Sequence, residues 1–305
     1  MTTAQIDPSI LALAEAPLEE RAALPKSGFI GTMPRSGTWY LSLLLRFYDE
    51  LSQGKPLSIP SHGQAYIRSQ VALGVEHIAV FHAICPGFEH LQGPTREAWD
   101  RLSFFCDGYD IHQVFMEQSR CILDPCCNPN ARIGYLYRNP LDQAVSAYGH
   151  AISSDRVDKE MGVYSNPREF YLKAGLVSYI KQFFTYKTMR ELYPNQVALF
   201  RYEDLNRAPK ATFESILRFL GHDPSDGICQ RHVETALDQA SIDSVRNIEK
   251  LLGHSLADDQ RDPNGSHVKD GRIGKWKEVF KPEDLEQTQT TMAEFGIPMD
   301  FFTLD

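Results

Sequence analysis

The stretch FIGTMPRSGTWYLSLLLRF, residues 29–47, predicts a strand, a tight turn and a helix in immediate succession. Its first residues are apolar, its last residues place leucines at helical spacing, and Gly, Pro and Ser surround a single arginine, Arg35, between them. A loop that enters a helix N-terminus presents backbone N–H groups and the positive end of the helix dipole, so it favours anions. Gly31 and Gly37 permit the tight turn. We therefore expect a phosphate-binding loop.

The loop differs from that of the nucleotide triphosphatases. Their loop reads G-x-x-x-x-G-K-S/T, in which the lysine follows the second glycine and a hydroxyl binds magnesium. Here Thr38 and Trp39 follow Gly37, and the cation, Arg35, precedes it. The sequence favours phosphate binding without metal-assisted phosphoryl transfer. A structural turn with an exposed arginine is the alternative interpretation of the loop taken alone.

Composition and charge limit the classes of function. The 305 residues carry a formal net charge of −9, with 42% apolar and 23% charged residues, which is ordinary for a globular protein. The acidic balance argues against nucleic-acid and anionic-membrane partners. We see no apolar run of membrane-spanning length and no basic signal-peptide region. We expect a cytoplasmic protein with one domain, residues 1–305, and helical residues 1–26 as an N-terminal arm.

The cysteines do not predict a metal site. No C-x-x-C pair occurs, and no paired Cys/His spacing follows the adjacent Cys126 and Cys127, so free thiols are expected. The six cysteines are residues 85, 106, 121, 126, 127 and 229.

Apolar strands alternate with amphipathic helices along the chain, which predicts an α/β fold with a mainly parallel sheet. The third strand, within ARIGYLYRNP at 131–140, is nearly all apolar until Arg138, which suits a sheet covered on both faces. We expect strands at 27–32, within 75–89 and ending near His82, at 131–138, and within 196–205. We expect helices at 37–51, 140–150, 168–192 and 209–220, and a helical tail over 230–305 with a Gly-rich loop at 264–274.

Four motifs resemble those of the sulfotransferases that use 3′-phosphoadenosine 5′-phosphosulfate (PAPS). TMPRSGTWY, residues 32–40, resembles their phosphosulfate loop, roughly P-K/R-S/A-G-T-T/S. RNPLDQAVSAY, residues 138–148, resembles their second signature, and RYEDL, residues 201–205, their Y-E-D-L element. KDGRIGKWK, residues 269–277, is similar to their C-terminal R-K-G-x-x-G-x-W-K loop. The resemblance implies a P-loop-like three-layer α/β fold and PAPS-dependent transfer of a sulfuryl group.

The resemblance also implies roles for individual residues. Arg35 would be catalytic and, with the rest of the loop, would bind the phosphosulfate. Arg138 and Ser146 would hold the 3′-phosphate of the donor, and Tyr202 would line the adenine pocket. The implied donor-binding residues are Arg35, Ser36, Gly37, Thr38, Trp39, Tyr40, Arg138, Ser146, Tyr202, Lys269, Gly271 and Arg272.

Two positions depart from the family pattern. Trp39 replaces a threonine, so one hydroxyl donor to the phosphosulfate is missing, and Trp39 or Tyr40 is the candidate for stacking on adenine. Lys269 stands where the family has arginine, so bidentate phosphate recognition is lost there, and Arg272 is the candidate to compensate.

The catalytic base is expected to be a histidine, because its pKa of about 6.5 lies near working pH. His82, at the end of the second strand, matches the place of the family's base; His112 is the alternative and a candidate for substrate binding. Phe81 is a candidate wall of an acceptor pocket. Glu203 and Asp204 are expected to bond backbone groups and helix N-termini rather than to take protons from substrate.

The acceptor is expected to be a small molecule, such as an alkaloid or another specialised metabolite, with a hydroxyl or an amine as nucleophile. The acidic surface hints at a neutral or cationic acceptor. The sequence leaves the oligomeric state open, with a homodimer as one expectation. Two alternatives stay open: a magnesium-dependent small-molecule kinase, and a nucleotide-binding protein without activity, for which Trp39 is the best argument.

Overall fold

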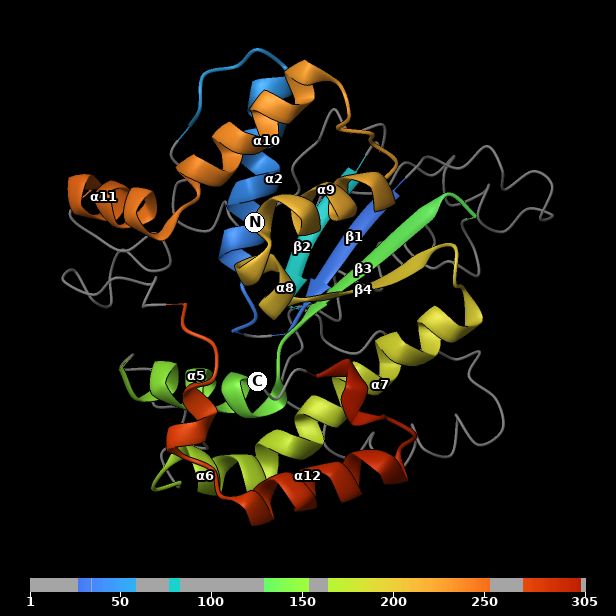
Figure 1. Cartoon of the computed structure of the whole chain (residues 1–305), viewed down its shortest axis with the longest axis vertical. Coiled ribbons are helices and arrows are strands. Elements are labelled where there is room, and N and C mark those ends of the chain that lie inside the picture. Colours follow the sequence, from blue (N-terminus) through green and yellow to red (C-terminus); the bar gives the residue numbers. More distant parts are fainter. Residues whose placement is uncertain are drawn as a thin grey trace, which may run out of the picture.

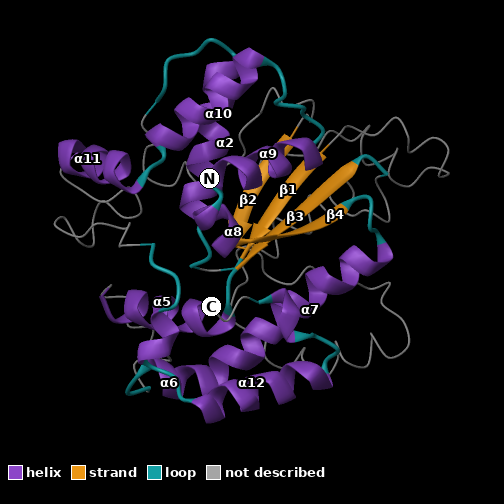
Figure 2. Cartoon of the chain, viewed as in Figure 1, coloured by secondary structure: helices purple, strands orange, loops and turns teal. Residues whose placement is uncertain are grey.

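The sheet is parallel throughout. The computed structural model describes residues 27–33, 35–58, 77–82, 129–153, 164–252 and 271–302. Within them, four strands lie in the order β2-β1-β3-β4, and every neighbouring pair is parallel. Helices cover both faces of the sheet (Figures 1 and 2). The predicted α/β fold is confirmed. The strands are β1 (Ser27–Thr32), β2 (His77–His82), β3 (Ala131–Tyr137) and β4 (Val197–Arg201).

The helices divide between the two faces of the sheet. Helix α2 packs against α10 on one side, and α7 packs under β4 on the other, with α12 beyond it (Figure 1). The first group is α2 (Thr38–Ser52), α8 (Tyr202–Arg207), α9 (Pro209–Phe219), α10 (Gly227–Gln239) and α11 (Ile242–Leu252). The second group is α5 (Pro140–Ser153), α6 (Pro167–Phe170), α7 (Leu176–Leu192) and α12 (Pro282–Glu294). Short 3₁₀ turns lie at Lys275–Glu278 and Met299–Phe301.

Strand β3 connects the two apolar cores. Its side chains alternate between the faces of the sheet, as strand geometry requires. Tyr135 and Tyr137 enter the cluster formed with α7 and α12, whereas Leu136 enters the cluster formed with α2, α9 and α10. A strand buried on both faces is nearly all apolar, and β3 departs from this only at the partly buried Arg132, so the sequence predicted it.

Two predicted segments differ from the structure. The helix expected at 168–192 is interrupted by a π-helical turn, Tyr171–Gly175, between α6 and α7. Gly175 leaves room there for the ring of Phe170, which lies 3.2 Å from where a Cβ would be.

The second difference follows the fourth strand. The strand lies within its predicted range and ends at Arg201, but the residues of its exit, Tyr202–Arg207, form helix α8, which the sequence did not predict. The carboxylate of Asp204 in the first turn accepts hydrogen bonds from Arg201, at 2.7 Å from Nε and 3.0 Å from Nη2, and an acidic first turn suits a helix N-terminus.

The carboxyl ends of the strands meet at one edge of the sheet, where ligands of open α/β sheets bind. Thr32 of β1 pairs with His82 of β2 and Leu136 of β3. The loops that follow these strands therefore start side by side. In the described part of the chain, no helix is both long enough and apolar enough to span a bilayer.

Candidate active site

The loop between β1 and α2 has an unusual backbone. Arg35 has φ 69°, and it is the only non-glycine with positive φ among the described residues. This left-handed conformation costs an ordinary residue about 1–2 kcal/mol. The turn is closed by the Ser36 N–H, which donates to the Met33 carbonyl at 3.0 Å, and Gly37 follows at φ 88°. This turn places Arg35 two residues before Gly37, the N-cap of α2, at the positive end of the helix dipole.

The hydroxyl of Ser36 forms no hydrogen bond with any described residue. The side chain is fully buried, and its Oγ has no hydrogen-bond partner there. Beside it, the hydroxyls of Thr32 and Thr38 bond each other at 2.7 Å. An unpartnered buried hydroxyl costs about 1–3 kcal/mol, so its presence in an anion-favouring loop fits a phosphate or sulfate oxygen.

Arg138, directly after β3, ties the loops of the site together. Its Nη1 donates to the Arg35 carbonyl at 3.3 Å, and its Nη2 donates to the Arg272 carbonyl at 3.0 Å. Its guanidinium lies over the Tyr202 ring, 4.7 Å from the centroid. Arg138 is buried, with only 5% of its surface exposed, and yet its Nε has no hydrogen-bond partner among the described residues. Arg138 therefore braces the site and still has one N–H for a ligand.

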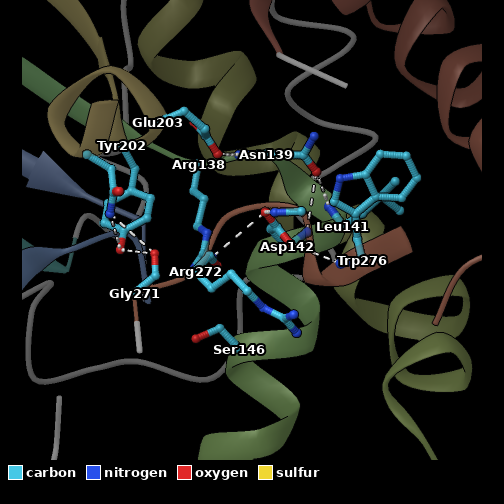
Figure 3. A network of polar contacts seen from close by, with 12 residues as sticks. Arg138, Asn139, Leu141, Asp142, Ser146, Tyr202, Glu203, Gly271, Arg272 and Trp276 are labelled. Carbon is cyan, nitrogen blue, oxygen red and sulfur yellow. Dashed lines mark hydrogen bonds and ion pairs between the residues drawn. The ribbon is translucent and has the colours of Figure 1, made fainter. Parts of the chain in front are cut away.

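The start of α5 is fixed by the residue before it. Asn139 Oδ1 accepts hydrogen bonds from the N–H groups of Leu141 and Asp142, at 2.9 Å and 3.3 Å, as a helix cap does. Its own N–H donates to Glu203 Oε1 at 2.8 Å (Figure 3). Glu203 thus bonds the backbone at a helix start, as expected. Burial raises the pKa of this carboxyl, and the Asn139 N–H counteracts that rise in part.

Ser146 lies two turns into α5 and contacts the phosphate loop. The Arg35 Nε donates to Ser146 Oγ at 3.4 Å. Arg138 and Ser146 were both predicted from the motif at residues 138–148. Both of them contact Arg35. The three residues come from the β1–α2 loop, the end of β3 and the body of α5.

The C-terminal loop closes this side of the site. Tyr202 Oη and Asn206 Nδ2 both donate to the Gly271 carbonyl at 3.2 Å. Gly271 has φ 61°, a left-handed conformation that favours glycine at this anchor. The Arg272 Nη2 lies 2.8 Å from Glu278 Oε1, and its side chain is half exposed. Figure 3 shows this loop between Tyr202 and α5.

The aromatic candidates differ in exposure. Trp39 is 7% exposed and belongs to the apolar cluster of α2 and α9, so its role toward adenine stays a prediction. Tyr40 is half-buried, and burial followed by the nearby Tyr202 raises its pKa to about 12. The Tyr202 ring also lies against Gly37. Tyr40 and Tyr202 are therefore neighbours beside the phosphate loop.

Several predicted residues are placed only in part. Phe81 and His82 have a described backbone, the last two positions of β2, and His82 is the register partner of Thr32. The runner-up base His112 and the predicted phosphate ligand Lys269 lie outside the described residues, as do residues 1–26. Cys229 is the one cysteine that is described, as a free thiol. The described residues contain no group of three or more metal-ligating side chains.

Sequence reasoning assigned no role to three residues that build the site: Asn139, Asp142 and Asn206. Asn139 carried a usable signal, because an asparagine directly before a first-turn proline is a preferred helix cap. Asp142 and Asn206 bond to residues 271–276, more than sixty positions away in sequence, and no local pattern announces such contacts.

The comparison with protein families gives the class. The chain matches the sulfotransferase domain family over residues 25–295, so it belongs to that family. This assignment confirms the resemblance to the PAPS-dependent sulfotransferases and the expected enzyme class. The chain is 24% identical over 288 residues to Sulfotransferase 1A1 of Rattus norvegicus, which covers 93% of this chain and 89% of that protein.

Solved structures agree on the fold. A retinol dehydratase in complex with androsterone and the inactive cofactor PAP superposes with a TM-score of 0.53 at 15% identity, covering 97% of this chain and 87% of that one. Mouse sulfotransferase SULT7A1 complexed with PAP gives a TM-score of 0.51 at 17% identity, covering 95% of this chain and 90% of that one. At such identities the likeness shows the shared fold.

Proposed function

We propose that this enzyme moves the sulfuryl group of PAPS to a hydroxyl or amine of a small molecule, by in-line displacement and without a metal, within a single domain of residues 1–305. One observation carries the proposal. Ser36 Oγ and Arg138 Nε are buried, lack partners in the described structure and belong to adjoining loops at the N-terminus of α2. Structural relatives hold PAP, the spent form of that donor, which supports the same donor here.

The residues of the site fit the donor's two anionic ends. Arg35, Ser36, Gly37 and Thr38 would hold the 5′-phosphosulfate at the positive end of α2. Arg138 and Ser146 would hold the 3′-phosphate, together with Lys269, Gly271 and Arg272. Trp39, Tyr40 and Tyr202 would border the adenine. The donor, when bound, supplies an activated sulfuryl group whose leaving group is PAP.

The transfer needs little beyond orientation and charge stabilisation. The acceptor oxygen or nitrogen forms a bond to sulfur, and the sulfur–oxygen bond to the 5′-phosphate breaks with its electron pair on PAP. Arg35 and the loop N–H groups stabilise the negative charge that grows on that oxygen. His82 takes the acceptor's proton; its position beside Thr32, where β2 meets the phosphate loop, supports this role.

The acceptor is proposed to be a small molecule. The retinol dehydratase structures contain androsterone or retinol, both small hydroxylated compounds, which supports this class of acceptor. A specialised metabolite or alkaloid, a cytoplasmic location and homodimer formation are proposals that rest on the sequence alone.

A labelled-donor assay tests the proposed function. Sulfur-35 PAPS is incubated with the enzyme, excess EDTA and a panel of phenols, aliphatic alcohols and amines. Label must move to an acceptor in the presence of EDTA. Arg35→Ala must lower the rate about 10²–10³-fold, the usual effect of losing one preorganised donor. Arg218→Ala is the matched control and must retain the rate, because Arg218 lies on the surface of α9 and, among the described residues, forms ion pairs with Glu214 and Asp223 alone.

The assay also separates the alternatives. A kinase would require magnesium and ATP, and would leave the sulfur label in PAPS. A nucleotide-binding protein without activity would bind PAP and transfer no label. Between the two histidines, His82→Ala must lower the rate and abolish the acidic limb of the pH–rate profile, where protonation inactivates the base, and His112→Ala must not; the reverse result would transfer the role of base to His112.

A further inference from the structure

Asp142 holds the C-terminal loop from the side of α5. Its Oδ2 accepts a hydrogen bond from the Gly274 N–H at 2.7 Å, and its Oδ1 accepts one from the Trp276 N–H at 3.0 Å. The carboxylate is fully buried, and Oδ2 also lies 3.8 Å from Arg138 Nη2. Gly274 has φ 83°, so the loop turns sharply where Asp142 holds it. Figure 3 shows these contacts converging from three segments.

The position of this carboxylate needs an explanation. Asp142 and Ser146 lie four residues apart and so on one side of α5, and Arg138 precedes that helix with its Nη2 3.8 Å from Asp142 Oδ2. Arg138 and Ser146 are the proposed ligands of the 3′-phosphate, and an acid between them would repel that phosphate. Two backbone N–H donors and one guanidinium compensate this charge. The acid is therefore directed at the loop and not at the donor.

The same loop is anchored at its other end. Tyr202 and Asn206 of α8 bind the Gly271 carbonyl, and Arg138 binds the Arg272 carbonyl between the two anchors. Residues 271–276 are thus held at both ends and in the middle by groups that surround the proposed 3′-phosphate site.

We propose that Asp142 is a positioning residue that sets residues 271–276 and the Arg138 guanidinium in place for the 3′-phosphate of the donor. The inference rests on the proposed function of this site. It differs from a purely structural role in one respect: the loss of Asp142 must weaken binding of the nucleotide by the folded protein, and not only the stability of the fold.

The test is the affinity for adenosine 3′,5′-bisphosphate (PAP), measured by calorimetry, together with hydrogen exchange of the loop amides. Asp142→Asn keeps the shape but replaces one acceptor oxygen by an N–H donor. The Kd for PAP must rise about 10- to 100-fold, the effect of losing a hydrogen bond to a charged group. The amides of Gly274 and Trp276 must exchange faster.

Asp284→Asn is the matched control. Asp284 is a buried carboxylate with the same kind of partners, because it accepts two hydrogen bonds from Arg168 at 2.7 Å and one from the Lys281 N–H at 2.9 Å, away from the site. This variant must lower the melting temperature and leave the Kd for PAP unchanged.

Four results would overturn the inference. Equal PAP affinity of Asp142→Asn and wild type would overturn this inference but not the proposed function. An equal loss of affinity in the Asp284→Asn control would do the same. Failure of the wild-type chain to bind PAP would overturn the proposed function with it. If Asp142→Asn does not fold, the wild-type chain decides: PAP must slow exchange of the Gly271–Trp276 amides, and unchanged exchange would refute the proposal.

Discussion

At the scale of the residue, the loop between β1 and α2 combines two unfavourable features, and a bound anion would relieve the second of them. Arg35 adopts a left-handed backbone, and Ser36 buries a hydroxyl without a partner in the described structure. Such features together cost a few kcal/mol in the empty protein, and they persist where the surrounding fold over-determines them. Their concentration within two consecutive residues supports the proposal that this loop binds the donor.

Ser36→Ala is predicted to have opposite effects on stability and on binding. Without a ligand, removing the unpartnered hydroxyl should raise the free energy of unfolding by about 1 kcal/mol. With a ligand, the variant lacks one hydrogen-bond donor, and the Kd for PAP should rise about tenfold. Urea denaturation and calorimetry measure the two effects.

Ser42 supplies the control for this prediction. Ser42 lies on α2, the helix that follows the loop. Its Oγ is likewise buried and has no hydrogen-bond partner in the described structure. Ser42→Ala should stabilise the protein and leave PAP binding unchanged. A loss of stability in Ser36→Ala together with unaltered PAP affinity would show that the hydroxyl serves the fold.

At the scale of the element, the turn into α2 depends on one glycine for two reasons. Gly37 has φ 88°, and a Cβ there would lie 2.8 Å from the Tyr202 ring. Gly54, just after the same helix, has φ 64° and open space around it. Comparing alanine variants at both positions separates backbone strain from steric conflict.

Gly54→Ala is predicted to cost about 1–2 kcal/mol of stability, the penalty of the left-handed conformation. Gly37→Ala should cost about 1–3 kcal/mol more, because the methyl group displaces Tyr202. Gly37→Ala should also abolish PAP binding, because the Tyr202 ring packs against the Arg138 guanidinium and the Tyr202 hydroxyl donates to the Gly271 carbonyl. Urea denaturation and calorimetry measure both; equal losses in the two variants would contradict the account.

Glu203 links α8 to the start of α5 and makes stability depend on pH. Burial raises the pKa of this carboxyl above its ordinary 4.5. Below pH 4.5 the group is neutral in both the folded and the unfolded state; as pH rises through the raised pKa, charging it costs more in the folded state, so stability falls. Glu203→Gln cannot ionise, and its carbonyl can still accept the Asn139 N–H.

The difference in unfolding free energy between Glu203→Gln and wild type should therefore shift in favour of the variant as pH rises from 4.5 to neutrality. Urea denaturation at several pH values measures it. A difference that does not vary with pH would show that the burial of Glu203 carries no ionisation cost.

The elements that the sequence predicted well are those with a strong local pattern. Strand β1 was predicted with both of its ends, and β3 by a run that is apolar except at Arg132. The π turn at 171–175 and helix α8 were missed, because both depend on contacts across the fold and on one ion pair rather than on periodicity. Arg35 and Gly37 could be found from spacing, whereas Asp142 and Asn206 could not, because their partners lie far away in sequence.

At the scale of the whole molecule, the parallel sheet brings three segments that are distant in sequence to one edge. The loop after β1, the connection from β3 into α5 and residues 271–276 meet there, and Arg138 of the second segment contacts the other two directly. A ligand that contacts all three segments would couple them and would bind only the folded chain. At a concentration of 100 times its Kd, such a ligand adds about 2.7 kcal/mol to the free energy of unfolding.

The most direct test of the account is a calorimetric titration of the wild-type chain with PAP in the presence of EDTA, beside a titration with ATP and magnesium. The account predicts that PAP binds without metal and that PAPS displaces it, whereas ATP with magnesium neither binds as tightly nor competes. The absence of PAP binding, or tighter binding of ATP with magnesium at the same loop, would contradict the account.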